Sequence, residues 1–380
     1  MRIGVIHDSL NYAGGAERVC LKTIEALKEA GHYVILASIE RTNWENVSRT
    51  FGPILRPDEE VYLFQQGFTS LRFYVSLLSP IILYLIRDRC DSTICTAEEL
   101  MLLRTDFGYM HFLPISLLKS GLHSGGKSTV GFYSLPFKLL QKRKLKSLEE
   151  GQLVANSVFT QDALERAFGR KATVVYPPVD VERLTPLMEH ERLADTALTV
   201  GRYSPEKNFE LVLSLAELLP ATRFVIIGNF SGAISVAYYR RLLRIKEAKR
   251  LNNITLLHDQ PYSRLATVLA SSSLFVSATI NEHFGVAIVE GMAAGLVPIV
   301  HRSGGPWKDI LGEEQGLYGF SYADAAEAAG IISELKADRG KVKDILSRNR
   351  ERSRAFSETI FKSKMVELFS VRRRNASEVA

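Results

Sequence analysis

The stretch from Asn281 to Gly295 constrains the fold of this chain more than any other part of its sequence. An apolar run at residues 274–278 precedes it and a second apolar run at residues 297–300 follows it, and both runs are typical of buried strands. Between them, a short helical pattern begins near Phe284 and ends at Gly295, where a left-handed residue closes a helix at little cost. The stretch therefore predicts a strand, a polar turn, a helix and a second strand.

A strand–turn–helix unit presents backbone N–H groups and the positive end of a helix dipole at its turn. Such a turn suits a diphosphate or a ring of sugar hydroxyls. Glu282 lies in the predicted turn and Glu290 on the predicted helix. A carboxylate accepts two hydroxyl hydrogen bonds at once, which suits the adjacent hydroxyls of a ribose or a hexose. The spacing alone is weak evidence, because two glutamates at this separation often occur by chance.

Length, charge and cysteine content bound the class of protein. At 380 residues the chain suits two domains rather than one hydrophobic core. The net charge of +6 favours anionic partners such as nucleotide diphosphates or an acidic membrane surface. The sequence contains no basic-aromatic module, so we expect no nucleic-acid partner. Cys20, Cys90 and Cys95 lack zinc spacing and cannot all pair, which predicts a reducing, cytoplasmic compartment.

Two segments bear on membranes and targeting. Residues 1–5 run directly into a predicted strand, so we expect no signal peptide. Residues 71–86 are apolar but contain Pro80, and a bilayer span needs about 20 apolar residues, so we expect a buried helix broken at Pro80. Residues 132–146 alternate leucines and aromatics with cations, a pattern that fits either peripheral contact with an anionic membrane or a solvated helix face.

Alternating strand and helix patterns predict a doubly wound α/β sheet in each half of the chain. In the first half, a strand at residues 2–7 leads through a loop with Gly14 and Gly15 to a helix from Arg18. Paired glycines let a backbone approach a ligand, although a simple tight turn explains them equally well. His111 stands at the predicted carboxyl end of a strand, where open α/β sheets bind ligands.

The second half begins after a weakly hydrophobic stretch, residues 181–195, which we take as the linker. Its first strand ends at Gly201, and Arg202 and Lys207 follow. Fixed cations stabilise the negative charge that grows on a departing nucleoside diphosphate. The alternative is that both are ordinary surface residues.

The whole string around Glu282 and Glu290, together with Ser-Gly-Gly-Pro at residues 303–306, closely resembles the E-x7-E motif of the retaining glycosyltransferases of family GT4. It is most similar to the dolichol-pathway α-1,2-mannosyltransferases. The Gly-Gly-Ala-Glu loop at residues 14–17 and the strand–Gly–Arg and Pro-Glu-Lys-Asn pattern at residues 201–208 resemble the same family. The segment from His111 to Pro114 resembles the family's His-aromatic-Pro pattern but departs from it by the insertion of Leu113.

The resemblance implies a GT-B fold, α/β in class, with two Rossmann-like domains that face each other across a cleft. We place an acceptor domain at residues 1–183, with a terminal helix at about 358–380 packing back on it, and a nucleotide-sugar donor domain at residues 184–357. The catalytic residues implied are His111, Arg202, Lys207 and Glu282. The donor-binding residues implied are Gly14, Gly15, Gly201, Arg202, Lys207, Glu282, His283, Phe284, Gly285, Val286 and Glu290.

The activity implied is retaining transfer of a hexose, with α-mannose from GDP-mannose expected, to a lipid-linked or glycan acceptor. The sequence contains no D-x-D triplet, so we expect no metal and no cofactor beyond the nucleotide-sugar substrate. Alternatives are a UDP-glucose or UDP-GlcNAc donor, a sugar-nucleotide 2-epimerase, or a nucleotide-binding protein without catalysis. The membrane contact of residues 132–146 would place the protein on the cytoplasmic face of a membrane.

Overall fold

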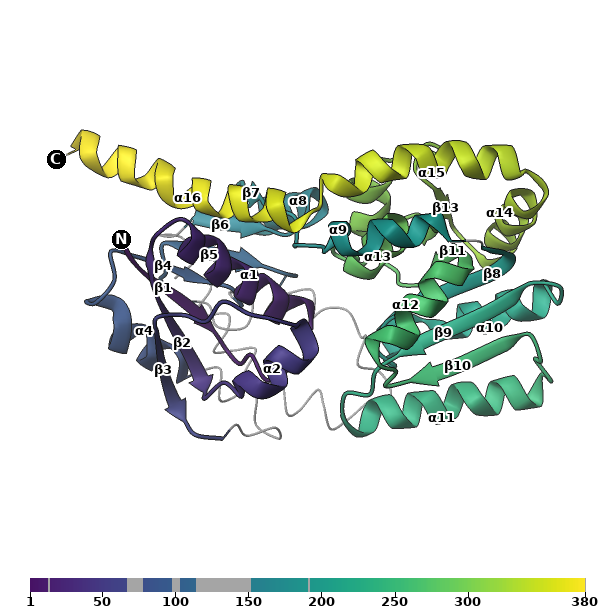
Figure 1. Ribbon diagram of the computed structural model, residues 1–380, viewed down its shortest axis with the longest axis horizontal. Coiled ribbons are helices and arrows are strands. Elements are labelled where there is room, and N and C mark those ends of the chain that lie inside the picture. The colour runs from purple at the N-terminus through teal and green to yellow at the C-terminus, as the bar shows by residue number, and fades with distance from the viewer. Residues whose placement is uncertain (13, 67–77, 98–102, 114–151, 191, 380) are drawn as a thin grey trace. The chain divides into compact units, whose positions relative to one another are not determined.

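The computed structural model describes residues 1–12, 14–66, 78–97, 103–113, 152–190 and 192–379 (Figure 1). The chain divides into two compact units, Met1–Pro178 with Glu358–Ala380, and Val179–Ser357. The boundary between the two units lies after Pro178 rather than after residue 183, because Val179 already packs with the second unit. The amide of Val179 donates to the carbonyl of Phe356 at 3.0 Å.

The first unit is built on one parallel sheet. Its strand order is β3-β2-β1-β4-β5-β6-β7, and every pairing is parallel. Parallel pairing buries both faces of the central strands, which explains their continuous apolar runs. The strands are β1 (Arg2–His7), β2 (Tyr33–Glu40), β3 (Glu59–Phe64), β4 (Ser92–Cys95), β5 (Phe107–Met110), β6 (Gln152–Ala155) and β7 (Thr173–Val174).

Helices α1 and α16 close one side of this unit. Phe361, Met365 and Phe369 recur every fourth residue along α16 and are buried in the core that α1 shares. The ring of Phe369 lies 4.9 Å from that of Phe107 in β5, edge to face. The C-terminal helix therefore belongs to the first unit. The helices of the unit are α1 (Gly15–Glu29), α2 (Trp44–Phe51), α4 (Ser79–Arg87), α8 (Val158–Phe168) and α16 (Glu358–Val379).

One sequence prediction in this unit needs correction. Helix α1 begins at Gly15 rather than at Arg18, because Gly14 is extended and serves as its N-cap. Of the helix predicted at residues 71–86, the structure describes α4, which begins at Ser79 and has Pro80 in its first turn, where no amide partner is lost. Only one face of α4 is buried; Tyr84 on the other face is 80% exposed. Residues 71–77 and 132–146 lie outside the described residues.

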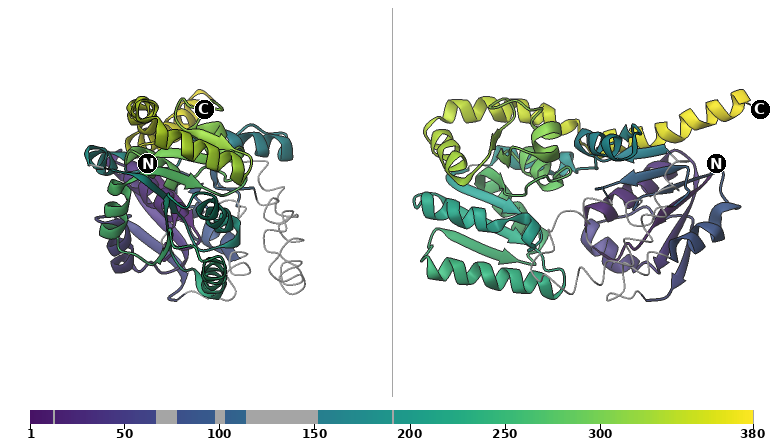
Figure 2. Two further views of the ribbon diagram at one scale, coloured as in Figure 1. Left: turned by 90° about the vertical axis from the view of Figure 1, so that its right-hand side faces the viewer. Right: turned by 180° about the vertical axis from the view of Figure 1, so that it is seen from behind.

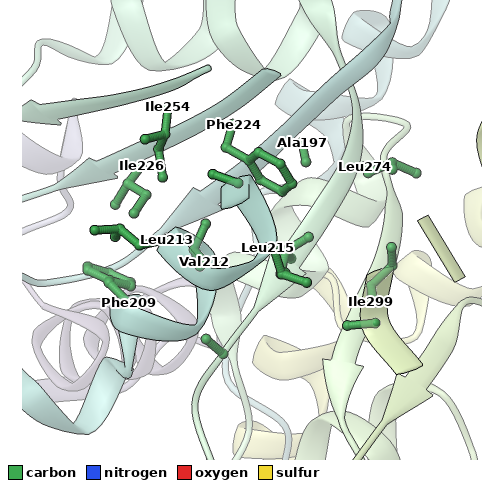
Figure 3. Close-up of a cluster of buried hydrophobic side chains, with 14 of the residues drawn as sticks. Ala197, Phe209, Val212, Leu213, Leu215, Phe224, Ile226, Ile254, Leu274 and Ile299 are labelled. Atoms are coloured by element: carbon green, nitrogen blue, oxygen red, sulfur yellow. The ribbon is translucent and has the colours of Figure 1, made fainter. Parts of the chain in front are cut away.

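The second unit repeats the parallel α/β pattern. Its strand order is β10-β9-β8-β11-β12-β13, again with parallel pairings throughout. Apolar side chains from α10 pack against those of the central strands, as Figure 3 shows for Phe209, Phe224 and Leu274. The strands are β8 (Leu193–Val200), β9 (Arg223–Gly228), β10 (Ile254–His258), β11 (Ser272–Ser277), β12 (Val297–His301) and β13 (Phe320–Tyr322).

Helices lie on either side of the strands of this unit (Figure 2). They are α9 (Val181–Leu184), η4 (Thr185–Glu189), η5 (Pro205–Lys207), α10 (Phe209–Leu218), α11 (Gly232–Ala248), α12 (Tyr262–Ser271), α13 (Val286–Ala293), η6 (Pro306–Ile310), α14 (Ala325–Ala337) and α15 (Arg339–Arg354). Within the described parts of the chain, no helix combines the length and the apolar character needed to cross a bilayer.

The reactivity of the three free cysteines tests the packing of the first unit. Cys20 and Cys95 are fully buried, and burial raises the pKa of the Cys20 thiol to about 12. Cys90 is only partly buried. Because a thiol must be reached and ionised to react, the native protein should release about one equivalent of thionitrobenzoate from Ellman's reagent. In guanidinium chloride all three thiols should react.

The control for this titration is Cys90→Ser, which should react with Ellman's reagent only after unfolding. Rapid reaction of two or more thiols in the native protein would contradict the packing of α1 and β4 described above.

Candidate functional site

Three neighbouring strands of the second unit end at one edge of its sheet. Strands β8, β11 and β12 are adjacent and parallel, so the loops that follow them lie at the same carboxyl edge. The first of these loops carries Arg202 and Lys207, the second Glu282 and His283, and the third Ser303. This edge is where open parallel sheets place their ligands.

The central contact at this edge is an ion pair between Lys207 and Glu282. Lys207 Nζ lies 2.5 Å from Glu282 Oε2, and the two side chains are only 20% and 22% exposed. Burial alone would raise the pKa of the Glu282 carboxyl, but the ammonium of Lys207 and a hydrogen bond from Thr279 hold that pKa below its ordinary value. Glu282 is therefore ionised at neutral pH.

The backbone before Lys207 is fixed from both sides. Residues Pro205–Lys207 form a single 3₁₀ turn, and Asn208 follows in a left-handed conformation with φ of 50°. The side-chain amide of Asn208 donates to the carbonyl of Ala278 in the loop after β11. Tyr203 is fully buried, and its hydroxyl donates to the carbonyl of Leu257. These anchors point the lysine across the sheet edge toward Glu282.

Arg202 and Gly201 complete this first loop. The side chain of Arg202 is 63% exposed and has a long ion pair of 3.6 Å with Glu206. Such an arginine can turn toward an anion at little cost, because an exposed pair contributes little stability. A Cβ at Gly201 would lie 3.4 Å from the Lys207 side chain, an ordinary contact, so Gly201 adjoins the lysine stem.

Helix α13 begins at Val286, shortly after Glu282 in the sequence. Gly285 precedes it with φ of +95°, and no side chain among the described residues caps this N-terminus. The first amides of α13, starting at Val286, therefore suit an anionic or hydroxylic ligand. Phe284 is buried edge to face against Phe356 at 5.4 Å, so only its backbone remains for the site. Glu290 projects from the second turn of the helix and is partly buried.

His283 sits beside this pair with a perturbed pKa. Burial lowers the pKa of its imidazole, and the nearby Lys207 adds to this, while Glu282 opposes it. His283 is therefore neutral at pH 7 and offers one donor and one acceptor nitrogen rather than a charge.

Sequence reasoning missed an aromatic surface at the same sheet edge. Phe230 follows β9 and His258 ends β10, and their rings stack at 4.5 Å with an interplanar angle of 20°. Tyr239 meets both rings edge to face. Asp259 accepts a hydrogen bond from the amide of Phe230, which fixes the two strand ends together. A stacked aromatic face of this kind suits a planar ring. The sequence signal was an aromatic residue near each strand end, Phe230 two residues after β9 and His258 as the last residue of β10.

Gly14, Gly15 and His111 lie in the first unit. A Cβ at Gly14 would lie 2.6 Å from a carboxylate oxygen of Glu17, whereas Gly15 has open space. His111 follows β5 directly, and its Nε2 lies 3.0 Å from the carbonyl of Thr96. A carbonyl only accepts, so Nε2 of His111 donates this hydrogen bond.

The structure thus joins Lys207 to Glu282 and sets both beside α13, which carries Val286 and Glu290. In the described ranges there is no group of three or more His, Cys, Asp or Glu side chains placed to hold a metal ion.

A comparison with known protein families matches the part of the chain that carries the Lys207–Glu282 pair. The model of the family Glycosyl transferases group 1 matches residues 192–352. The GDP-Man:Man(3)GlcNAc(2)-PP-Dol alpha-1,2-mannosyltransferase of Dictyostelium discoideum is 29% identical over 222 residues, 54% of this chain and 43% of the relative. The protein of that name from Kluyveromyces lactis is 25% identical over 362 residues, 81% of this chain and 63% of the relative. Both matches span less than two thirds of the relatives' own lengths.

Solved structures match over nearly the whole chain. Sucrose-phosphate synthase from Thermosynechococcus elongatus has a TM-score of 0.75 and 16% identity, and covers 99% of this chain and 100% of its own. Anabaena HepE in complex with UDP has a TM-score of 0.73 and 17% identity, and covers 98% of this chain and 100% of its own. The fold of this chain is therefore the GT-B fold.

The Lys207–Glu282 ion pair predicts how substitutions at these two positions change the free energy of unfolding. Lys207→Met leaves a mostly buried carboxylate without its cation, and Glu282→Gln removes the charge that compensates the lysine. Each change should lower the free energy of unfolding by about 1–3 kcal/mol. The double variant should recover most of the loss, because both charges leave together. Urea unfolding of the four proteins measures this cycle.

The matched control is Lys249→Met, which breaks the more exposed Lys249–Glu217 pair and should cost less than about 1 kcal/mol. The pH dependence has a fixed sign. Because the folded-state pKa of Glu282 is lowered, its contribution is full above the ordinary value of 4.5 and is lost as the pH falls through the lowered value. Single variants as stable as the unmodified protein would show that the pair contributes nothing.

Proposed function

We propose that this chain, whose residues 192–352 form a group 1 glycosyl transferase domain, is a retaining glycosyltransferase that transfers α-mannose from GDP-mannose to a lipid-linked or glycan acceptor. The observation that carries the proposal is the Lys207–Glu282 pair near the N-terminus of α13, which no described side chain caps, inside the matched region. The relatives named above as GDP-mannose-dependent enzymes supply the choice of donor.

In this proposal the donor diphosphate lies between the cations and the helix. Lys207 and the exposed Arg202 meet the charge that grows on the departing phosphate, and the first amides of α13 add a positive dipole end. The charge is largest in the transition state, so these groups accelerate the reaction rather than merely bind its substrate.

The carboxylates would hold the sugars. Each carboxylate oxygen can accept two hydrogen bonds, so Glu282 keeps acceptor capacity for a hexose hydroxyl beside its contacts with Lys207 and Thr279. Glu290, farther along α13, would take the ribose hydroxyls. Neutral His283 suits a hydroxyl better than a phosphate, because it offers no charge. The resemblance assigns His111 to the far edge of the hexose.

The reaction we propose proceeds on one face of the sugar. The bond from the anomeric carbon to the phosphate oxygen breaks, and the acceptor oxygen bonds to the same face. The acceptor's proton passes to the departing phosphate, which becomes the leaving nucleoside diphosphate. This route needs no carboxylate nucleophile on the opposite face and gives retention of configuration.

The acceptor and the membrane contact rest on different observations. The relatives' names refer to a dolichol-linked acceptor, which supports a lipid-linked substrate here. Residues 132–146, for which we propose contact with an anionic cytoplasmic membrane surface, lie outside the described residues. Within the described chain, the exposed face of α4 carries Ile81, Tyr84 and Leu85 and ends at Arg87, a composition that suits a membrane interface.

The reaction itself is tested by a panel of donors. The protein should consume GDP-mannose in preference to UDP-glucose and UDP-GlcNAc, and Lys207→Met should lower kcat by on the order of 10²-fold. The product formed with a dolichol-type lipid-linked acceptor should show α-anomeric coupling by NMR. A β-linked product would overturn the one-face mechanism, and preference for a UDP-sugar would overturn the donor. Binding of nucleotide without transfer or hydrolysis of any donor would favour a non-catalytic protein.

Metal independence is a separate expectation, because the charge on the leaving group is assigned to Lys207, Arg202 and α13. Turnover of GDP-mannose in excess EDTA should stay within about twofold of turnover in Mg²⁺, since cations and amides replace the metal. A loss that Mg²⁺ or Mn²⁺ restores would assign the charge to a metal instead. Lys207→Met with added Mg²⁺ is the control, and it should remain impaired.

A further inference from the structure

The loop that carries Glu282 rests on the loop that follows the neighbouring strand β12. The amide of Asn281 donates to Oγ of Ser303 at 2.8 Å. The amide of Gly305 donates to the carbonyl of Glu282 at 2.8 Å. Nδ1 of His301 lies 2.7 Å from the same Ser303 oxygen, which fixes that hydroxyl. Hydrogen bonds therefore join the two loops on either side of Glu282.

The glycines of the second loop lie against the backbone of the first. A Cβ at Gly304 would lie 2.4 Å from the carbonyl oxygen of Glu282. A Cβ at Gly305 would lie 2.2 Å from the carbonyl oxygen of His283. These obstacles are backbone atoms, which cannot rotate aside as a side chain can. Only a residue without Cβ allows the two loops to approach this closely.

The two glycines are required for different reasons. Gly304 has φ of +74°, which a residue with Cβ rarely adopts, so both its conformation and its surroundings demand glycine. Gly305 has φ of −61°, which any residue adopts, so space alone demands glycine there. Asn281 is itself left-handed with φ of 53°. The hydrogen bond from its amide to Ser303 helps to hold that unusual conformation.

We infer that Ser303, Gly304 and Gly305 are positioning residues that set the backbone of residues 281–283, so that Glu282 meets Lys207 before a donor binds. The inference rests on the proposed function for its activity readout. The supporting loop, residues 303–305, acts through backbone contacts and need not touch the donor itself.

The geometry gives the expected size of the effect. Relief of a 2.2 Å contact requires the loops to separate by about 1 Å, because ordinary contacts to Cβ begin near 3.4 Å. A displacement of that order at groups that meet the transition state costs about 10²-fold in rate. Nucleotide binding should suffer less, because Arg202 and Glu290 lie outside the displaced residues 281–283.

The test uses two variants of the supporting loop in the full chain. Gly305→Ala introduces the clash, and Ser303→Ala removes only the hydroxyl that holds Asn281. For each variant we would measure turnover, GDP binding by calorimetry, and amide hydrogen exchange at Asn281 and Gly305 by NMR. The matched controls are Gly330→Ala, at an exposed position of α14 with open space, and Gly312→Ala, with φ of +68° but open space.

Gly305→Ala should lower kcat/KM for GDP-mannose by on the order of 10²-fold while GDP affinity changes by less than about fivefold. Ser303→Ala should raise exchange at Asn281 at least about tenfold and lower kcat/KM about tenfold. Gly330→Ala and Gly312→Ala should keep kcat/KM within about twofold of the unmodified protein, because neither touches residues 281–283.

If Gly305→Ala fails to fold, Ser303→Ala decides the question alone. Unchanged exchange at Asn281 together with unchanged kcat/KM in Ser303→Ala would overturn the inference. If the unmodified protein transfers no sugar, the proposed function fails, and hydrogen exchange still tests whether the supporting loop holds residues 281–283. Equal losses of GDP affinity and turnover would show a general structural role instead.

Discussion

Parallel pairing is the constraint on which the arrangement of this protein depends. Every strand pair in both sheets is parallel, so each strand must be followed by a crossover and all carboxyl ends gather at one edge. In the second unit this collects the loops after β8, β11 and β12, which are far apart in the sequence. Lys207 and Glu282 meet because their strands are neighbours, although 75 positions separate them in the chain.

The carboxyl edge of the second sheet holds the charges of Lys207 and Glu282 in a mostly buried environment, which determines what these two groups can do. A buried carboxylate without a partner would be costly, and Lys207 supplies the partner at 2.5 Å. The same lysine retains further N–H donors for an anion, because an ammonium has three. The pair therefore serves stability in the free protein and leaves a cation ready beside the N-terminus of α13. The match of residues 192–352 to the group 1 glycosyl transferase model is consistent with that use.

Backbone contact between residues 303–305 and residues 281–283 fixes the position of Glu282 more tightly than side-chain contacts alone would. Gly304 and Gly305 let the supporting loop lie directly on residues 281–283, with hydrogen bonds on both sides of Glu282. Elsewhere in the same unit, the guanidinium of Arg192 donates to carbonyls at the ends of η4, α12 and α13, which holds the far end of the helix that carries Glu290. Both ends of α13 are thus fixed by contacts that are remote in sequence.

The sequence by itself determined the α/β class, the strand–turn–helix unit around Glu282, and the left-handed glycine at 295, because periodicity and glycine conformation are local properties. It also indicated the cations, through spacing and resemblance. It misplaced the start of α1, since capping depends on the exact backbone conformation at each helix end. The Lys207–Glu282 contact, the stacked Phe230 and His258, and the clash that reserves position 305 for glycine followed only from the tertiary structure. Each depends on which strands are neighbours in a sheet, and no local pattern in a single sequence encodes that order.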